Sequence, residues 1–137
     1  MTDQSVLTTE LLGAFDDSVL DVDKACTLPA ACYTSDEFLA FERNALFDHE
    51  WLCVGRADKI PGPGDYFTAA VNGERLIIAR AKDGTVHAFS AICQHRGMQI
   101  VDDCGNCGTF TCPYHQWVYA LDGRLLTRTE LAAEVVR

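Results

Sequence analysis

Two short runs, CQHRG at 93–97 and CPYHQW at 112–117, each hold one cysteine and one histidine. One residue separates Cys93 from His95, and two residues separate Cys112 from His115. Thiolate sulfur and neutral imidazole nitrogen together select zinc or an iron–sulfur centre over harder cations. The chain must therefore adopt a fold that brings two loops together around a metal.

The order of the four residues distinguishes between these metals. A zinc finger typically groups a cysteine pair first and a histidine pair later, on a helix. Here each run supplies one of each, so Cys93 and Cys112 can hold one iron of a two-iron cluster. His95 and His115 then hold the other iron, which is the Rieske type of [2Fe–2S] centre. Structural zinc remains the alternative.

Composition and charge describe an ordinary globular chain. Its 137 residues, 48 % of them hydrophobic, are enough for one domain with a hydrophobic core. The net charge of −9 argues against nucleic acid as a partner, because phosphate binding needs a basic surface. No apolar run approaches the roughly 20 residues that cross a bilayer, and the start lacks the basic residues of a signal peptide. We therefore expect a soluble, cytoplasmic protein without a membrane partner.

The seven cysteines predict metal ligands or buried thiols, because a reducing compartment disfavours disulfides. Cys104 and Cys107 form a Cys-x-x-Cys pair in a glycine-containing stretch that we predict to be a turn between the two runs. No second cysteine pair and no βαβ pattern accompany it, which favours incidental thiols over a redox or zinc motif. The other three cysteines are expected to pack as small apolar residues: Cys26, Cys32 and Cys53.

The N-terminal third of the sequence predicts helices and irregular chain. Residues 1–33 are an acidic, weakly patterned lead with one short helix over 7–15. Thr34-x-x-Glu37 matches a capping box, and apolar residues follow it at three- and four-residue intervals. This pattern predicts an amphipathic helix over 35–48.

From residue 51 to about 126 short apolar runs alternate with turns, which is typical of antiparallel β-structure. The Asn72-Gly73 pair predicts a two-residue hairpin, and the final run, 129–137, adds no closing element. The sequence therefore predicts a mainly all-β antiparallel sandwich with the two Cys/His runs at hairpin tips. The expected strands are WLCVG (51–55), YFTAAV (66–71), ERLIIAR (74–80), TVHAFSAI (85–92), GTFTC (108–112) and WVYAL (117–121).

The two runs resemble the N-terminal part of the large α subunit of the Rieske non-haem iron oxygenases, of the aromatic-ring-hydroxylating dioxygenase type. The similarity extends from about residue 27 to 126 and includes DGRL at 122–125. It implies a Rieske [2Fe–2S] domain over 34–137 that receives electrons from a ferredoxin or a flavin reductase. The electrons would pass to a mononuclear Fe(II) in a C-terminal catalytic domain of the same or a neighbouring α subunit. There O2 is activated to hydroxylate or demethylate a small organic substrate.

Two features depart from the family's pattern. Gln116 follows the second histidine, where the family usually has glycine, and this puts the backbone of that loop in question. The chain ends at Arg137, and only His49 and His87 remain for a site of two histidines and one carboxylate. We therefore expect an electron-transfer domain that is not catalytically complete by itself. A free-standing Rieske ferredoxin is the alternative, and a zinc-stabilised structural module is the third hypothesis.

Three residues near the runs are candidates for supporting the centre. Arg96 is expected to support the first loop, and Trp117 to shield the cluster or pack in the core. Tyr119, four residues after His115, can donate a hydrogen bond toward a ligand sulfur, with core packing as the alternative. The N-terminal stretch is similar to α subunits that act on quaternary ammonium compounds or small aromatic acids, and the sequence does not specify a substrate further.

Overall fold

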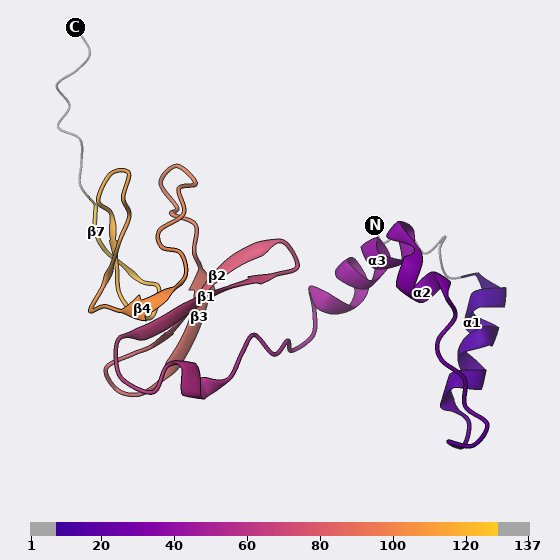
Figure 1. Ribbon diagram of the computed structural model, residues 1–137. Helices are drawn as coiled ribbons and strands as arrows, with labels where there is room; N and C mark the ends of the chain where they lie inside the picture. The colour runs from indigo at the N-terminus through magenta and orange to yellow at the C-terminus, as the bar shows by residue number, and fades with distance from the viewer. Residues whose placement is uncertain (1–7, 129–137) are drawn as a thin grey trace, which may run out of the picture. The chain divides into compact units, whose positions relative to one another are not determined.

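The computed structural model describes residues 8–128, and the chain divides into two compact units, Met1–Leu52 and Cys53–Arg137 (Figure 1). The predicted run at 129–137 lies outside the described residues. Within 8–128, no helix is both long enough and apolar enough to cross a membrane. The N-terminal unit is helical and contains α1 (Thr9–Phe15), η2 (Asp16–Val19), α2 (Ala31–Thr34), α3 (Asp36–Glu42) and the π-helical turn η3 (Arg43–Phe47).

The helix expected over 35–48 is present, but its cap differs from the prediction by one residue. Ser35 is the N-cap: its Oγ accepts a hydrogen bond from the Phe38 N–H at 3.1 Å. The same hydroxyl donates to the Glu37 carboxylate at 2.8 Å. Thr34 instead ends α2, where its hydroxyl bonds back to a carbonyl of the preceding turn. The predicted capping box at Thr34 is therefore wrong, because the preceding α2 already engages that residue.

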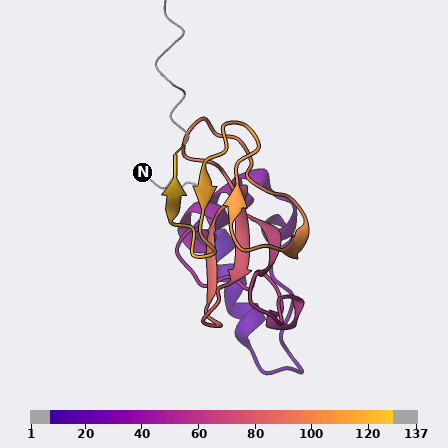
Figure 2. The same cartoon turned by 90° about the vertical axis from the view of Figure 1, so that its left-hand side faces the viewer.

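The second unit contains two antiparallel sheets. A four-stranded sheet has the order β3-β2-β1-β4, and a three-stranded sheet has the order β5-β6-β7 (Figure 2). A short 3-10 turn, η4, precedes them over Ala57–Lys59. This mainly antiparallel β-architecture is the predicted fold class. The strands are β1 (Asp65–Val71), β2 (Glu74–Arg80), β3 (Val86–Ser90), β4 (Cys104–Asn106), β5 (Phe110–Thr111), β6 (Val118–Tyr119) and β7 (Leu125–Thr127).

The hairpin between β1 and β2 has the turn that its sequence predicts. Asn72 and Gly73 have φ angles of 48° and 89°, and two positive values are what a type I′ turn requires. The register that follows pairs Val71 with Glu74. Strand β2 is central in its sheet, with β1 and β3 on its two sides.

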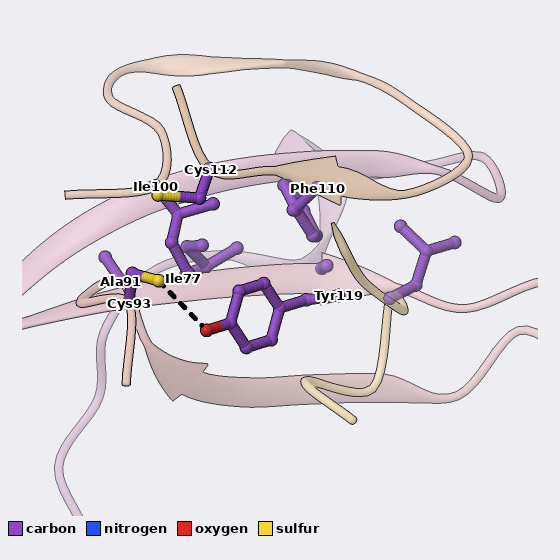
Figure 3. Packing of buried hydrophobic residues seen from close by; sticks show 9 residues of the cluster. Ile77, Ala91, Cys93, Ile100, Phe110, Cys112 and Tyr119 are labelled. Atoms are coloured by element: carbon purple, nitrogen blue, oxygen red, sulfur yellow. Dashed lines mark hydrogen bonds between the residues drawn. The ribbon is translucent and has the colours of Figure 1, made fainter. Parts of the chain in front are cut away.

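Successive side chains of β2 face two different hydrophobic clusters, because strand residues alternate between the faces of a sheet. Ile78 packs on one face with Ile60 and Phe67. Ile77 packs on the other face, in a larger cluster that both sheets supply (Figure 3). The larger cluster is Ile77, Ala79, Ala91, Cys93, Ile100, Phe110, Cys112, Tyr119 and Leu121.

Phe110 of β5 joins the two sheets. Its ring makes an edge contact with Tyr66 of β1 at a centroid distance of 5.1 Å and another with Phe89 of β3 at 5.7 Å. Edge-to-face aromatic pairs of this kind stabilise by about 0.5–1.5 kcal/mol beyond the area that they bury. The larger cluster is therefore the layer between the sheets.

Two strand predictions are wrong. Residues 51–55 form no strand, and Trp51 and Cys53 are exposed. The stretch predicted as a turn around Cys104 instead forms β4, which pairs with β1 through Tyr66 and Gly105. Glycine normally suggests a turn. At Gly105 it permits a close approach, because a Cβ there would lie 3.0 Å from the Tyr66 hydroxyl.

Alanine substitutions at Gly64 and Gly84 can test how tightly the chain packs at the β1–β4 edge. Both have a φ of +88°, but a Cβ at Gly64 would lie 2.7 Å from the Cys107 carbonyl oxygen, whereas one at Gly84 meets nothing within 4 Å. We expect Gly84→Ala to lower the free energy of unfolding by about 1 kcal/mol, from the left-handed backbone alone. Gly64→Ala should cost an additional 1–3 kcal/mol, roughly, from the clash. Urea denaturation measures both changes in the free energy of unfolding. Equal losses would contradict the prediction, because they would show that the β1–β4 edge accommodates the added methyl group.

Candidate metal centre

The two Cys/His runs form loops with one hydrogen-bond pattern. In each, the cysteine N–H donates to the carbonyl five residues later, and the N–H four residues after the cysteine donates back to the cysteine carbonyl. These bonds measure 2.7 and 3.0 Å for Cys93, and 2.8 and 3.0 Å for Cys112. A bridge between Ile92 and Gln99 closes the first loop, and β5 and β6 flank the second. Both runs therefore lie at hairpin tips, as predicted (Figure 2).

The fourth residue after each cysteine has a left-handed backbone. Its φ is +70° at Gly97 and +59° at Gln116. Glycine adopts this region freely, whereas a residue with a Cβ pays about 1 kcal/mol or more. The departure from the family's glycine at Gln116 therefore leaves the loop geometry intact and adds backbone strain.

The two cysteines are buried between the sheets. Cys93 and Cys112 are each 2 % exposed and belong to the same buried cluster (Figure 3). Burial alone would raise the pKa of the Cys93 thiol. Hydrogen bonds from the Tyr119 hydroxyl and from backbone N–H groups of the loop outweigh it, so this pKa lies below its usual value. The first loop therefore favours the thiolate, which is the form that binds metal.

Tyr119 connects the core to the first loop. Its Oη lies 3.1 Å from Cys93 Sγ (Figure 3). The same oxygen accepts a hydrogen bond from the Gln94 N–H at 3.2 Å. Burial, followed by the hydrogen bond to Cys93, raises the pKa of Tyr119 to about 12. Because the backbone N–H already donates to the hydroxyl oxygen, the phenolic hydrogen is free to point at the sulfur.

The two histidines also lie together, at the half-buried edge of the loops. The rings of His95 and His115 have centroids 4.6 Å apart and an interplanar angle of 71°. Each ring has an aromatic cover. Trp117 stacks on His95 at 4.7 Å and 12°, and Tyr114 lies against His115 at 3.8 Å. Burial, with the nearby His95 and a loop arginine, lowers the pKa of His115, so the neutral imidazole is favoured.

The donor atoms fit a two-iron cluster. Among residues 8–128, the buried Nδ1 of His115 has no hydrogen-bond partner, which is costly unless the atom has another bonding role. The two sulfurs form one pair and the two imidazoles another, as two irons with two protein ligands each require.

Known proteins with this arrangement identify the family. The sequence pattern of the Rieske [2Fe–2S] domain matches residues 50–135, which is more than half of the chain. The chain belongs to the Rieske [2Fe–2S] domain family. Its cofactor is therefore a two-iron, two-sulfide cluster.

The curated relatives are subunits of Rieske oxygenases. The chain is 42 % identical over 101 residues to the glycine betaine monooxygenase oxygenase subunit of Chromohalobacter salexigens. It is 38 % identical over 111 residues to the carnitine monooxygenase oxygenase subunit of Acinetobacter baumannii. These alignments cover 73 and 80 % of this chain but only 23 and 30 % of the relatives. The chain thus spans less than a third of the length of either protein.

Solved structures show the same fold. The apo form of the quaternary ammonium Rieske monooxygenase CntA matches with a TM-score of 0.70 and 37 % identity, over 76 % of this chain and 31 % of that one. Naphthalene 1,2-dioxygenase from Rhodococcus sp. matches with a TM-score of 0.73 and 32 % identity, over 90 % of this chain and 28 % of that one. The β-architecture is therefore that of the Rieske domains of oxygenases.

The other predicted residues of the Rieske centre have distinct places. Arg96 is exposed, and its backbone N–H donates toward Cys93. Trp117 is half-buried; it stacks on His95 and packs against the larger hydrophobic cluster, so the expected core packing is present. Tyr119 likewise combines its hydrogen bond with core packing.

Sequence reasoning missed one aromatic residue and misplaced several thiols. Tyr114 covers His115, and its position directly before that histidine was the available signal. Cys104 opens β4 and is exposed, whereas burial raises the pKa of Cys107; both are free thiols. Cys26 and Cys53 are exposed, so their prediction as packing residues is wrong.

The hydrogen bond from Tyr119 should tune the Rieske potential. We expect Tyr119→Phe to make the midpoint more negative by about 20–60 mV, the equivalent of one ordinary hydrogen bond of roughly 0.5–1.5 kcal/mol. The reason is that a donor to a sulfur that ligates the cluster, which is the role we propose for Cys93 Sγ, stabilises the more negative, reduced state. Protein-film voltammetry measures the shift. Tyr66→Phe, which removes a hydroxyl beside Gly105 of β4, is the matched control, and an equal shift there would contradict the assignment.

The backbone strain at Gln116 can be measured by comparing a glutamine-to-glycine substitution there with the same substitution at Gln94. Gln94→Gly, at a position whose φ is not positive, should lower the free energy of unfolding by about 0.5–1 kcal/mol, because glycine gains freedom in the unfolded chain. Gln116→Gly relieves the left-handed strain as well, so its effect should be more favourable by roughly 1–2 kcal/mol. Urea denaturation compares the two variants, and identical losses would refute the strain.

Proposed function

We propose that this chain is the electron-transfer domain of a Rieske oxygenase α subunit. In this proposal Cys93 and Cys112 hold one iron of the [2Fe–2S] cluster, and His95 and His115 hold the other. The observation that carries it is the pairing of two buried sulfurs with two half-exposed imidazoles on loops of equal shape. When bound, the cluster supplies a one-electron carrier.

The arrangement of the side chains suits electron transfer better than substrate chemistry. The cysteines are held inside the core, so water is kept from the sulfurs, while the histidine edge is open enough for electrons to leave or enter. With two protein ligands for each iron, the cluster would have no position for O2. The chain's own residues therefore bind, insulate and orient the carrier.

The relatives suggest the partners and the substrate class. Two relatives are named for glycine betaine and carnitine, which are quaternary ammonium compounds. The solved structure of a quaternary ammonium Rieske monooxygenase is described as giving insight into inter-subunit electron transfer. We therefore propose a ferredoxin or flavin reductase as the donor, and a mononuclear Fe(II) in a catalytic domain of the same or a neighbouring subunit as the acceptor. That iron would activate O2 to hydroxylate or demethylate a quaternary ammonium substrate.

We also propose the extent and setting of this domain. The Rieske domain is assigned to residues 34–137, with 1–33 as a lead, and the catalytic domain is placed outside this chain. The relatives' much greater length supports that division. We propose a cytoplasmic location, because a reducing compartment leaves cysteines available as metal ligands.

Two other functions remain to be tested against this one. A free-standing Rieske ferredoxin would share the cluster and differ only in lacking a catalytic domain, so the coding sequence after Arg137 distinguishes the two. A zinc-stabilised module would share the four ligands but would be colourless and silent in electron paramagnetic resonance. The paired sulfurs and paired imidazoles favour the two-iron cluster over zinc.

Metal analysis and ligand variants test the proposal. The purified chain should contain about two irons and two acid-labile sulfides and show the Rieske resonance signal. His95→Ala and His115→Ala should each abolish that signal and lower the thermal stability, because metal binding is coupled to folding. His87→Ala, on β3, is the matched control and should retain the cluster. Stoichiometric zinc without labile sulfide would overturn the two-iron cluster, and an unchanged signal in either loop variant would overturn the ligand assignment.

A further inference from the structure

Resting on the proposed function, we propose that Arg128, Trp117 and His95 form one stack that makes Arg128 a tuning residue of the cluster. The guanidinium lies over the indole ring with its carbon 6.0 Å from the ring centroid. Trp117 in turn packs nearly parallel to the His95 ring, at a centroid distance of 4.7 Å and an interplanar angle of 12°. The stack therefore links an exposed positive charge to a histidine of the centre.

Strand pairing, and not chance, brings Arg128 to Trp117. Strands β6 and β7 are antiparallel, and their register pairs Val118 with Thr127. One residue before Val118 and one residue after Thr127, this register places Trp117 opposite Arg128. The position of the guanidinium is therefore built into the hairpin that also carries the second loop.

A cation on an indole face is attracted by the negative face of the ring, and the interaction strengthens where water is excluded. Trp117 is half-buried and Arg128 is exposed, so one side of the contact is shielded and the other is open. Stacking on His95 also limits rotation of the imidazole about its side-chain bonds. The indole thus positions the ring, and the arginine holds the indole.

The charge of Arg128 acts in the opposite direction to the chain's net charge of −9. A reduced cluster carries one more negative charge than an oxidised one, so a nearby cation stabilises the reduced form and raises the midpoint potential. Arg96, which is exposed on the first loop, acts in the same direction. Because Arg128 is exposed, its contribution should shrink as ionic strength rises.

Replacing each of two arginines on the same hairpin by glutamine tests whether Arg128 tunes the midpoint potential. Arg128→Gln in the cluster-loaded full chain should shift the midpoint to more negative values, by up to about tenfold in the electron-exchange equilibrium, which is 59 mV for one electron. Arg124→Gln removes the same charge at the far end of β7, about 13 Å along the strand, and should leave the midpoint nearly unchanged. Arg128→Lys keeps the charge without the planar group and should retain most of the potential.

The outcomes separate this inference from the proposed function. Equal shifts for Arg128→Gln and Arg124→Gln would show an effect of net charge alone, and no shift for Arg128→Gln would show no tuning; either overturns the inference. Absence of a Rieske signal from the unaltered chain would instead refute the proposed function. A double-mutant cycle with Trp117→Leu adds a check on the stack, because the Arg128→Gln shift should shrink when the indole is gone. Both arginines are exposed, so their variants decide the question even if Trp117→Leu loses its cluster.

Discussion

Burial of two cysteines in one hydrophobic layer is the constraint on which the rest of this structure depends. Cys93 follows β3 of the four-stranded sheet and Cys112 follows β5 of the three-stranded sheet, yet both belong to the same buried cluster. The contacts that pack the sheets together, through Phe110 above all, therefore also set the distance between the sulfurs. A change in sheet packing would change the metal site directly.

From this buried pair the site opens outward in one direction. The sulfurs are almost inaccessible, the imidazoles are half-exposed, and aromatic rings cover them on the outside. Tyr119 supports the inner end, and its raised pKa keeps the hydroxyl protonated at any ordinary pH. Such an arrangement insulates a redox group on one side and leaves an edge for electron exchange on the other.

The two loops have the same shape, but the second loop carries backbone strain that the first does not. Both loops need a left-handed residue four positions after the cysteine, and only the first has glycine there. Gln116 therefore holds its conformation against its own backbone preference, which the surrounding hydrogen bonds and the flanking strands must offset. The strain lies beside the histidine edge, where small changes of loop shape would matter most for the proposed electron transfer.

The sequence by itself determined the features that depend on local chemistry. The Cys/His spacing indicated the type of centre, Asn72-Gly73 indicated its turn, and alternating apolar runs indicated most strands, because neighbouring residues suffice for each. Only the tertiary structure decided which segments pair across the chain. Strand β4 depends on Gly105 fitting under Tyr66, and the apolar run at 51–55 found no partner strand. The arrangement of Arg128, Trp117 and His95 could not be predicted from the sequence either. Strand register and sheet packing set those contacts, and both depend on segments that are distant in the sequence.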